Sequence, residues 1–239
     1  MKRVIFAAAL FIFSGLSFAQ SPGSSSERLF PTTRPTTRPA TSQAATQPVF
    51  EIEIICEVAD LKEWSESLRP IVEKWYPIIV QTLPSEGYTA PRKFSITIRE
   101  SDQIAFAAGG RIVCGAKWFR AHPDDRGAVV HELVHIVQQY RSRRNPGWLV
   151  EGMADYIRWF KYEPLSKRPR TRLTAKYTQG YQVTGAFLEW LCANKDHELA
   201  VKLNAAMRQG RYTAELWQEY TGKTVDELWA EYIETLRAK

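Results

Sequence analysis

The chain has 239 residues, a formal net charge of +6 and eight tryptophans. The charge is spread as +2 over residues 1–19, +2 over residues 20–48 and +2 over residues 49–239, so no basic stripe indicates a nucleic-acid-binding protein. Residues 49–239 are enough for one domain with a sizeable core, and their regular apolar spacing is typical of a globular protein.

The first residues have the pattern of a secretory signal. Lys2 and Arg3 give a positive start, an apolar run covers residues 4–18, and Ser17 and Ala19 are small residues before a cleavage site. We predict cleavage after Ala19, a transient contact of this segment with the membrane, and a product that is secreted or held in the cell envelope. An uncleaved anchor is the alternative, but the run is short for a membrane span.

Residues 20–48 form a linker rich in proline, threonine and serine, in which the sequence TTRP occurs twice. Such a segment buries too little apolar surface to offset the entropy of ordering it, and its prolines favour an extended spacer. We therefore place the folded domain at residues 49–239.

The first part of this domain alternates between strand and helix patterns. Residues 48–58 and 92–100 alternate apolar and polar side chains, as half-buried strands do, and residues 60–83 have helical apolar spacing. Residues 104–118 resemble two short strands joined at Gly109-Gly110. We expect these strands to form a small, mostly antiparallel sheet.

After Pro123 the spacing becomes helical, with helices expected over residues 124–140, 146–160, 181–193 and 196–210, and a last one beginning after residue 224. Asp124 or Asp125 would cap the first of these helices. Thr224 and Glu227 have the spacing of a capping box. Because strands precede helices, we predict an α+β fold.

The sequence HELVH places His131, Glu132 and His135 in an otherwise apolar helix. Residues four apart lie on one helical face, so the two imidazoles can bind one metal ion. Glu132 lies beside the position of a metal-bound water, where a carboxylate acts as general base. Buried polar groups are costly unless they are satisfied, and a zinc ion would satisfy these.

A catalytic zinc needs a third protein ligand and an open fourth position. Glu151 begins the sequence EGMADY on the next expected helix, and Asp155 follows four residues later on the same face. Asp155 can accept a hydrogen bond from the outer nitrogen of a liganding histidine. Gly152 and Ala154 would let the two helices approach closely.

The segments HELVHIVQQY, GWLVEGMADYIRW and QGYQVTGAFLEWL resemble the basic secretory protein family, also called peptidases of plants and bacteria. The resemblance covers most of residues 50–239 and implies a zincin-like fold, secretion and zinc-dependent proteolysis. It leaves Glu151 and Asp155 as candidates for the third ligand. Similarity to gluzincins, which keep an Asp four residues after the liganding Glu, favours Glu151.

These patterns predict hydrolysis of a peptide or protein substrate by a water that one zinc ion activates, with Glu132 as base. Tyr181 is the candidate donor to the oxyanion, or else a packed aromatic at a helix start. Residues 111–118 are either an edge strand that pairs with substrate or an ordinary sheet member. The competing hypothesis is a non-catalytic envelope or binding protein that zinc stabilises.

The three cysteines, Cys56, Cys114 and Cys192, match no metal motif. In an exported protein two of them could pair, although buried free thiols explain them equally well. The two other histidines, His122 and His197, are expected at the surface or at helix ends.

Overall fold

The structure, a computed structural model, describes residues 50–238. The predicted signal segment and linker lie outside the described residues. The described residues form one compact unit, and no helix among them is both long and apolar enough to cross a membrane.

A four-stranded sheet has the order β1-β2-β4-β3, where β1 is Glu51–Cys56, β2 Lys93–Arg99, β3 Ala105–Ala108 and β4 Arg111–Gly115. β1 pairs parallel with β2 and β2 parallel with β4, while only β3 and β4 are antiparallel. The expectation of a mostly antiparallel sheet is therefore wrong. The chain passes through helices between β1 and β2, and such crossovers make parallel neighbours.

Helices α1 (Lys62–Glu66) and α2 (Arg69–Thr82) replace the single helix expected over residues 60–83. Pro70 lies in the first turn of α2, where its missing N–H is tolerated and where it favours a new helix start. The ring of Tyr76 packs against Phe94 of β2 with 4.7 Å between centroids. α2 therefore covers the apolar face of the sheet.

Helix α3 (Ala116–Ala121) follows β4 directly, so the strand expected to reach residue 118 ends at Gly115. Helix α4 (Gly127–Gln138) begins after Arg126, and no side chain caps it. Asp125, one of the two expected caps, instead accepts hydrogen bonds from Trp118 and Arg158.

Helix α5 (Gly147–Ile157) begins after Pro146 and continues into a π-helical turn, Arg158–Tyr162. The chain ends with α6 (Tyr181–Asn194), α7 (Leu199–Arg208), α8 (Glu215–Thr221) and α9 (Val225–Arg237). The capping box of Thr224 and Glu227 is confirmed at the start of α9. Helix α8 was not expected as a separate element.

Close packing joins α5 to α6. A Cβ atom on Gly152 would lie 2.2 Å from Thr184 Cγ2, and one on Gly185 would lie 2.9 Å from the backbone nitrogen of Tyr156. The expectation that Gly152 brings α5 close to the preceding helix is therefore wrong, because its missing side chain makes room for α6.

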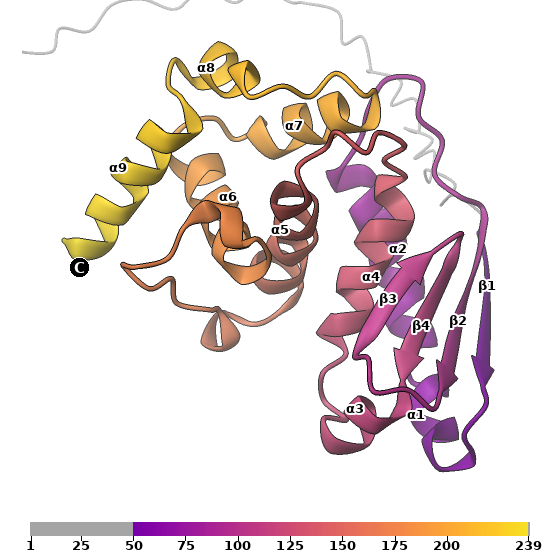
Figure 1. The fold of residues 1–239 in the computed structure, drawn as a ribbon. Coiled ribbons are helices and arrows are strands. Elements are labelled where there is room, and N and C mark those ends of the chain that lie inside the picture. Colours follow the sequence, from indigo (N-terminus) through magenta and orange to yellow (C-terminus); the bar gives the residue numbers. More distant parts are fainter. Residues whose placement is uncertain (1–49, 239) are drawn as a thin grey trace, which may run out of the picture. The chain divides into compact units, whose positions relative to one another are not determined.

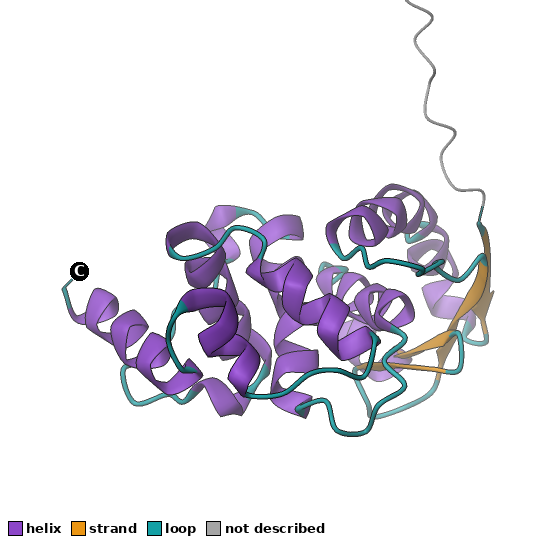
Figure 2. Ribbon diagram, turned by 90° about the horizontal axis from the view of Figure 1, so that it is seen from above, coloured by secondary structure: helices purple, strands orange, loops and turns teal. Residues whose placement is uncertain are grey.

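Helix α4 lies between the sheet and helix α5 (Figure 1). It contacts α2, β3 and β4 on one side and α5 on the other. Figure 2 shows the strands gathered at one side of the domain and helices over the rest. All three cysteines lie within the described residues and are free. The fold is thus α+β with a small mixed sheet, and the predicted metal-binding helix lies at its centre.

Candidate metal centre

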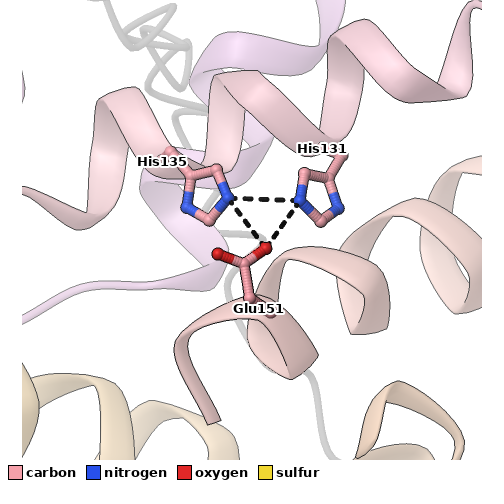
Figure 3. A group of neighbouring side chains, drawn as sticks. All are labelled: His131, His135 and Glu151. Atoms are coloured by element: carbon pink, nitrogen blue, oxygen red, sulfur yellow. Dashed lines mark hydrogen bonds and ion pairs between the residues drawn. The ribbon is translucent and has the colours of Figure 1, made fainter. Parts of the chain in front are cut away.

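Three donor atoms meet between α4 and α5 (Figure 3). Glu151 Oε2 lies 3.2 Å from His131 Nε2 and 3.4 Å from His135 Nε2. The two Nε2 atoms lie 3.1 Å apart. The structure thus brings together two imidazoles from one helix and a carboxylate from the next, a group that could hold a metal ion.

The spacing of these donors matches the requirements of a tetrahedral zinc site. Zinc–ligand bonds of about 2.0–2.1 Å in a tetrahedron put neighbouring donor atoms about 3.3 Å apart. The three distances here, 3.1, 3.2 and 3.4 Å, lie close to that value. Two imidazoles with one carboxylate are also a ligand set of catalytic zinc sites.

Each imidazole is held by an acceptor on its other nitrogen. Asp155 Oδ1 lies 2.7 Å from His131 Nδ1, and Asp155 is only 3% exposed. Asp155 therefore sits on the side of the ring opposite Glu151. Gln138 Oε1 lies 2.7 Å from His135 Nδ1. Acceptors at Nδ1 hold the proton there and leave Nε2 free to bind a metal.

Gln138 also links the two helices, since its Nε2 donates to the carbonyl oxygen of Val150 at 3.0 Å. It is absent from the site residues predicted above. The sequence could have indicated it, because Gln138 is a further polar side chain on the apolar helix that carries His131 and His135. In the fold it is 2% exposed and fixes the orientation of one imidazole.

The charges at this group favour a cation. Burial lowers the pKa of His131, but hydrogen bonds to Asp155 and Glu151 raise it by more, to about 9. Burial raises the pKa of Glu151, but hydrogen bonds to His131 and His135 lower it by more, to about 2. The carboxylate of Glu151 is thus anionic, and it stabilises positive charge between the two imidazoles, whether a proton or a metal ion carries that charge.

Glu132 lies beside this group and is 7% exposed. Burial raises the pKa of its carboxyl group, and His131, His135 and hydrogen bonding to the backbone of Ala107 lower the pKa by less. A carboxyl group with a raised pKa binds a proton more readily than an ordinary one, which is the direction that favours a general base.

An open cleft of about 1040 Å³ is lined by the three donor residues, His131, His135 and Glu151, and by Glu132. Residues 103–107, which include most of β3, line one side, and residues 179–183 at the start of α6 also line it. β3 is an edge strand, because it pairs only with β4. The edge role considered for residues 111–118 is wrong, since β4 lies between β2 and β3.

Tyr181 lies at the rim of this cleft. Its ring is nearly parallel to that of His131, with 6.1 Å between centroids, and the residue is 55% exposed. The negative charge of Glu151 raises the pKa of its hydroxyl group. Tyr181 is therefore not packed in the core, and its hydroxyl group is available to a bound molecule.

The remaining histidines lie away from the donor group. His122 stacks on Trp118 with 3.8 Å between ring centroids and lines a neighbouring cavity of about 620 Å³. His197 is exposed just before α7. Neither contributes to the metal group.

Arg208 of α7 anchors the C-terminal end of α4. Its guanidinium group donates to the carbonyl oxygens of Val137 and Gln138 at 3.1 Å each and to that of Leu83 at 2.9 Å. The hydroxyl group of Tyr88 also donates to Val137. These donors satisfy carbonyl groups that the last turn of a helix leaves without partners.

Residues 63–232 match the family described as "Peptidase of plants and bacteria". No curated protein and no solved structure matches the chain. The matched range contains the three donor residues together with Glu132, Gln138, Asp155 and Tyr181.

Proposed function

The chain belongs to the family of peptidases of plants and bacteria, the basic secretory protein family, and from this premise we propose that it is a zinc-dependent metallopeptidase. The observation that carries the proposal is the triangle of His131, His135 and Glu151 donor atoms, whose edges fit a tetrahedral zinc ion. When bound, zinc would lower the pKa of a water molecule and polarise a substrate carbonyl group.

The protein residues around this group have complementary roles. Glu132 accepts the proton of the attacking water and returns it to the leaving amine, which its raised pKa favours. Asp155 and Gln138 hold the two imidazoles in the orientation and tautomer that leave Nε2 free. Tyr181, at the cleft rim, donates a hydrogen bond to the oxygen that becomes negative in the transition state.

Strand β3 offers a route for recognition of an extended peptide. It lies at the edge of the sheet and its residues line the cleft. A peptide can add to such an edge through main-chain hydrogen bonds. The family and the sequence of residues 1–19 together support a place of action outside the cytoplasm, either secreted or in the cell envelope.

The test compares the wild-type protein with Glu132→Gln in a peptide-library digest, with metal analysis of both. We expect about one zinc per chain in each protein and loss of cleavage only in the variant, because Glu132 is a base and not a ligand. Glu189→Gln is the matched control, since it changes a carboxylate on α6 that pairs with Lys161 and Arg168 and does not line the cleft.

Two results would contradict the proposal. Cleavage that survives in Glu132→Gln at the wild-type rate would rule out the assigned base. Zinc in both proteins with no cleavage by either would support the competing hypothesis of a non-catalytic protein that zinc stabilises.

A further inference from the structure

The loop between the π-helical turn and α6, residues 163–177, has an unusual charge. It contains five basic side chains, at positions 167, 168, 170, 172 and 176, and one acidic side chain, Glu163. Residues 49–239 as a whole carry only +2. The net charge of +4 on this loop therefore exceeds the net charge of the whole domain. We call this segment the basic loop.

The inner side of the basic loop is fixed to the helices beneath it. Arg168 donates to the carbonyl oxygen of Phe160 at 3.1 Å and lies 3.5 Å from Glu189 of α6. The hydroxyl groups of Thr171 and Tyr232 lie 2.9 Å apart, which attaches the loop to α9. The backbone path of the loop, visible between α6 and α9 in Figure 1, is thus set by its inward side chains.

The outer side carries charge without partners. Arg170, Arg172 and Lys176 are exposed and form no ion pair with any residue in the range 50–238. Leu165 is 73% exposed and Leu173 49% exposed. Single exposed aliphatic residues are common, but here two of them share one anchored loop with three cations that have no ion-pair partner in the described residues.

We propose that this outer surface, residues 165–176, binds an anionic phospholipid membrane. Basic side chains are attracted to the negative surface of such a membrane, and leucines gain free energy when they enter the boundary of the acyl chains. An acidic protein would satisfy Arg170, Arg172 and Lys176 but would leave Leu165 and Leu173 without a role. Both leucines therefore favour lipid as the partner.

This contact goes beyond the membrane contact expected of residues 1–19 and does not depend on peptidase activity. It also has a geometric consequence. Lys176 is followed within a few residues by Gln179 and Tyr181, which line the cleft. A membrane-bound basic loop would hold that rim of the cleft close to the lipid surface.

The experiment measures co-sedimentation with vesicles of phosphatidylglycerol and phosphatidylcholine, and with vesicles of phosphatidylcholine alone. The protein begins at Gln20, the residue after the predicted cleavage site, so that the apolar run of residues 4–18 cannot contribute. We expect binding to the anionic vesicles, weakened by salt and absent from the neutral ones.

Arg170→Gln/Arg172→Gln should reduce binding at least about tenfold, because each basic side chain near an anionic surface contributes about fivefold. Leu165→Ser/Leu173→Ser should also reduce it. The matched control is Arg141→Gln/Arg143→Gln, which removes the same charge from another exposed basic segment. This control should bind like the wild type.

Three outcomes would overturn the proposal. The first is no binding to anionic vesicles. The second is an equal loss in the two arginine double variants, which would indicate attraction by net charge alone. The third is binding to polyglutamate but not to vesicles, which would assign the basic loop to an acidic protein partner. Circular dichroism of each variant checks that these surface changes leave the fold intact.

Discussion

The carboxylate of Asp155 lies 2.7 Å from Nδ1 of His131, on the opposite side of the imidazole from the Glu151 carboxylate. This relationship separates the roles of the two acidic residues of α5. Glu151 can be a metal ligand, and Asp155 can hold the ring that carries the neighbouring ligand atom.

We therefore predict that Asp155→Asn weakens zinc binding about 10–100-fold, the usual effect of losing the partner of a liganding histidine. Glu151→Gln should weaken it further, because a ligand itself is lost. Competition with a chromogenic chelator measures both affinities. The opposite ranking would make Asp155 the third ligand.

Tyr181→Phe should lower kcat about 10²–10³-fold, the cost of removing one oxyanion donor. Zinc content should not change, because the ring of Tyr181 lies beside His131 without sharing its donor atoms. Steady-state kinetics with a peptide found in the library digest measures the effect. An unchanged kcat in the variant would show that Tyr181 is not the oxyanion donor and only lines the cleft.

Gly152→Ala should destabilise the fold by about 1–3 kcal/mol, because the new methyl group would lie 2.2 Å from Thr184 and force α5 and α6 apart. Gly147→Ala, at the start of the same helix, meets no atom within 4 Å and is the control. Urea denaturation measures both. Equal stability of the two variants would show that the α5–α6 contact adapts without cost.

The ion pairs of Arg120 predict a pH dependence of stability. Hydrogen bonds from Arg120 lower the pKa values of both Asp60 and Glu100. Because these values are lower in the folded state, the pairs stabilise the fold above the pKa values of the unfolded chain. This contribution is lost as the pH falls through the folded-state values.

Arg120→Gln should therefore lower stability at pH 7, and the difference from the wild type should shrink as the pH falls from 7 through the lowered pKa values of Asp60 and Glu100. Urea denaturation across this pH range measures it. Arg69→Gln, which breaks an exposed pair with Glu73 at 3.8 Å, is the control. A difference for Arg120→Gln that does not vary with pH would contradict the assignment.

Local patterns in the sequence predicted the helices of the site and its donor residues. The spacing of His131 and His135 depends only on helical geometry, and both lie on α4 as expected. The capping box of Thr224 and Glu227 likewise depends on a few neighbouring residues. Such features are visible in one sequence because their partners are close in the chain.

Features that depend on distant partners could not be predicted. The direction of β2 relative to β1 depends on how the intervening helices cross the sheet, and the alternating pattern of the strands is the same for both directions. Gly152 was expected to face α4 because helix order along the chain does not reveal that α6 packs on α5. Asp125 was a candidate cap for α4. Its carboxylate instead accepts hydrogen bonds from Trp118 and Arg158, and these partners are visible only in the folded structure.

The guanidinium group of Arg208 ties three chain segments together, since it reaches the carbonyl oxygens of Leu83, Val137 and Gln138. A truncated protein that ends before α7 would lose this tie, and the last turn of α4 would fray next to His135. The shortest fragment able to keep His131, His135 and Glu151 in place must therefore extend well beyond the two helices that supply them.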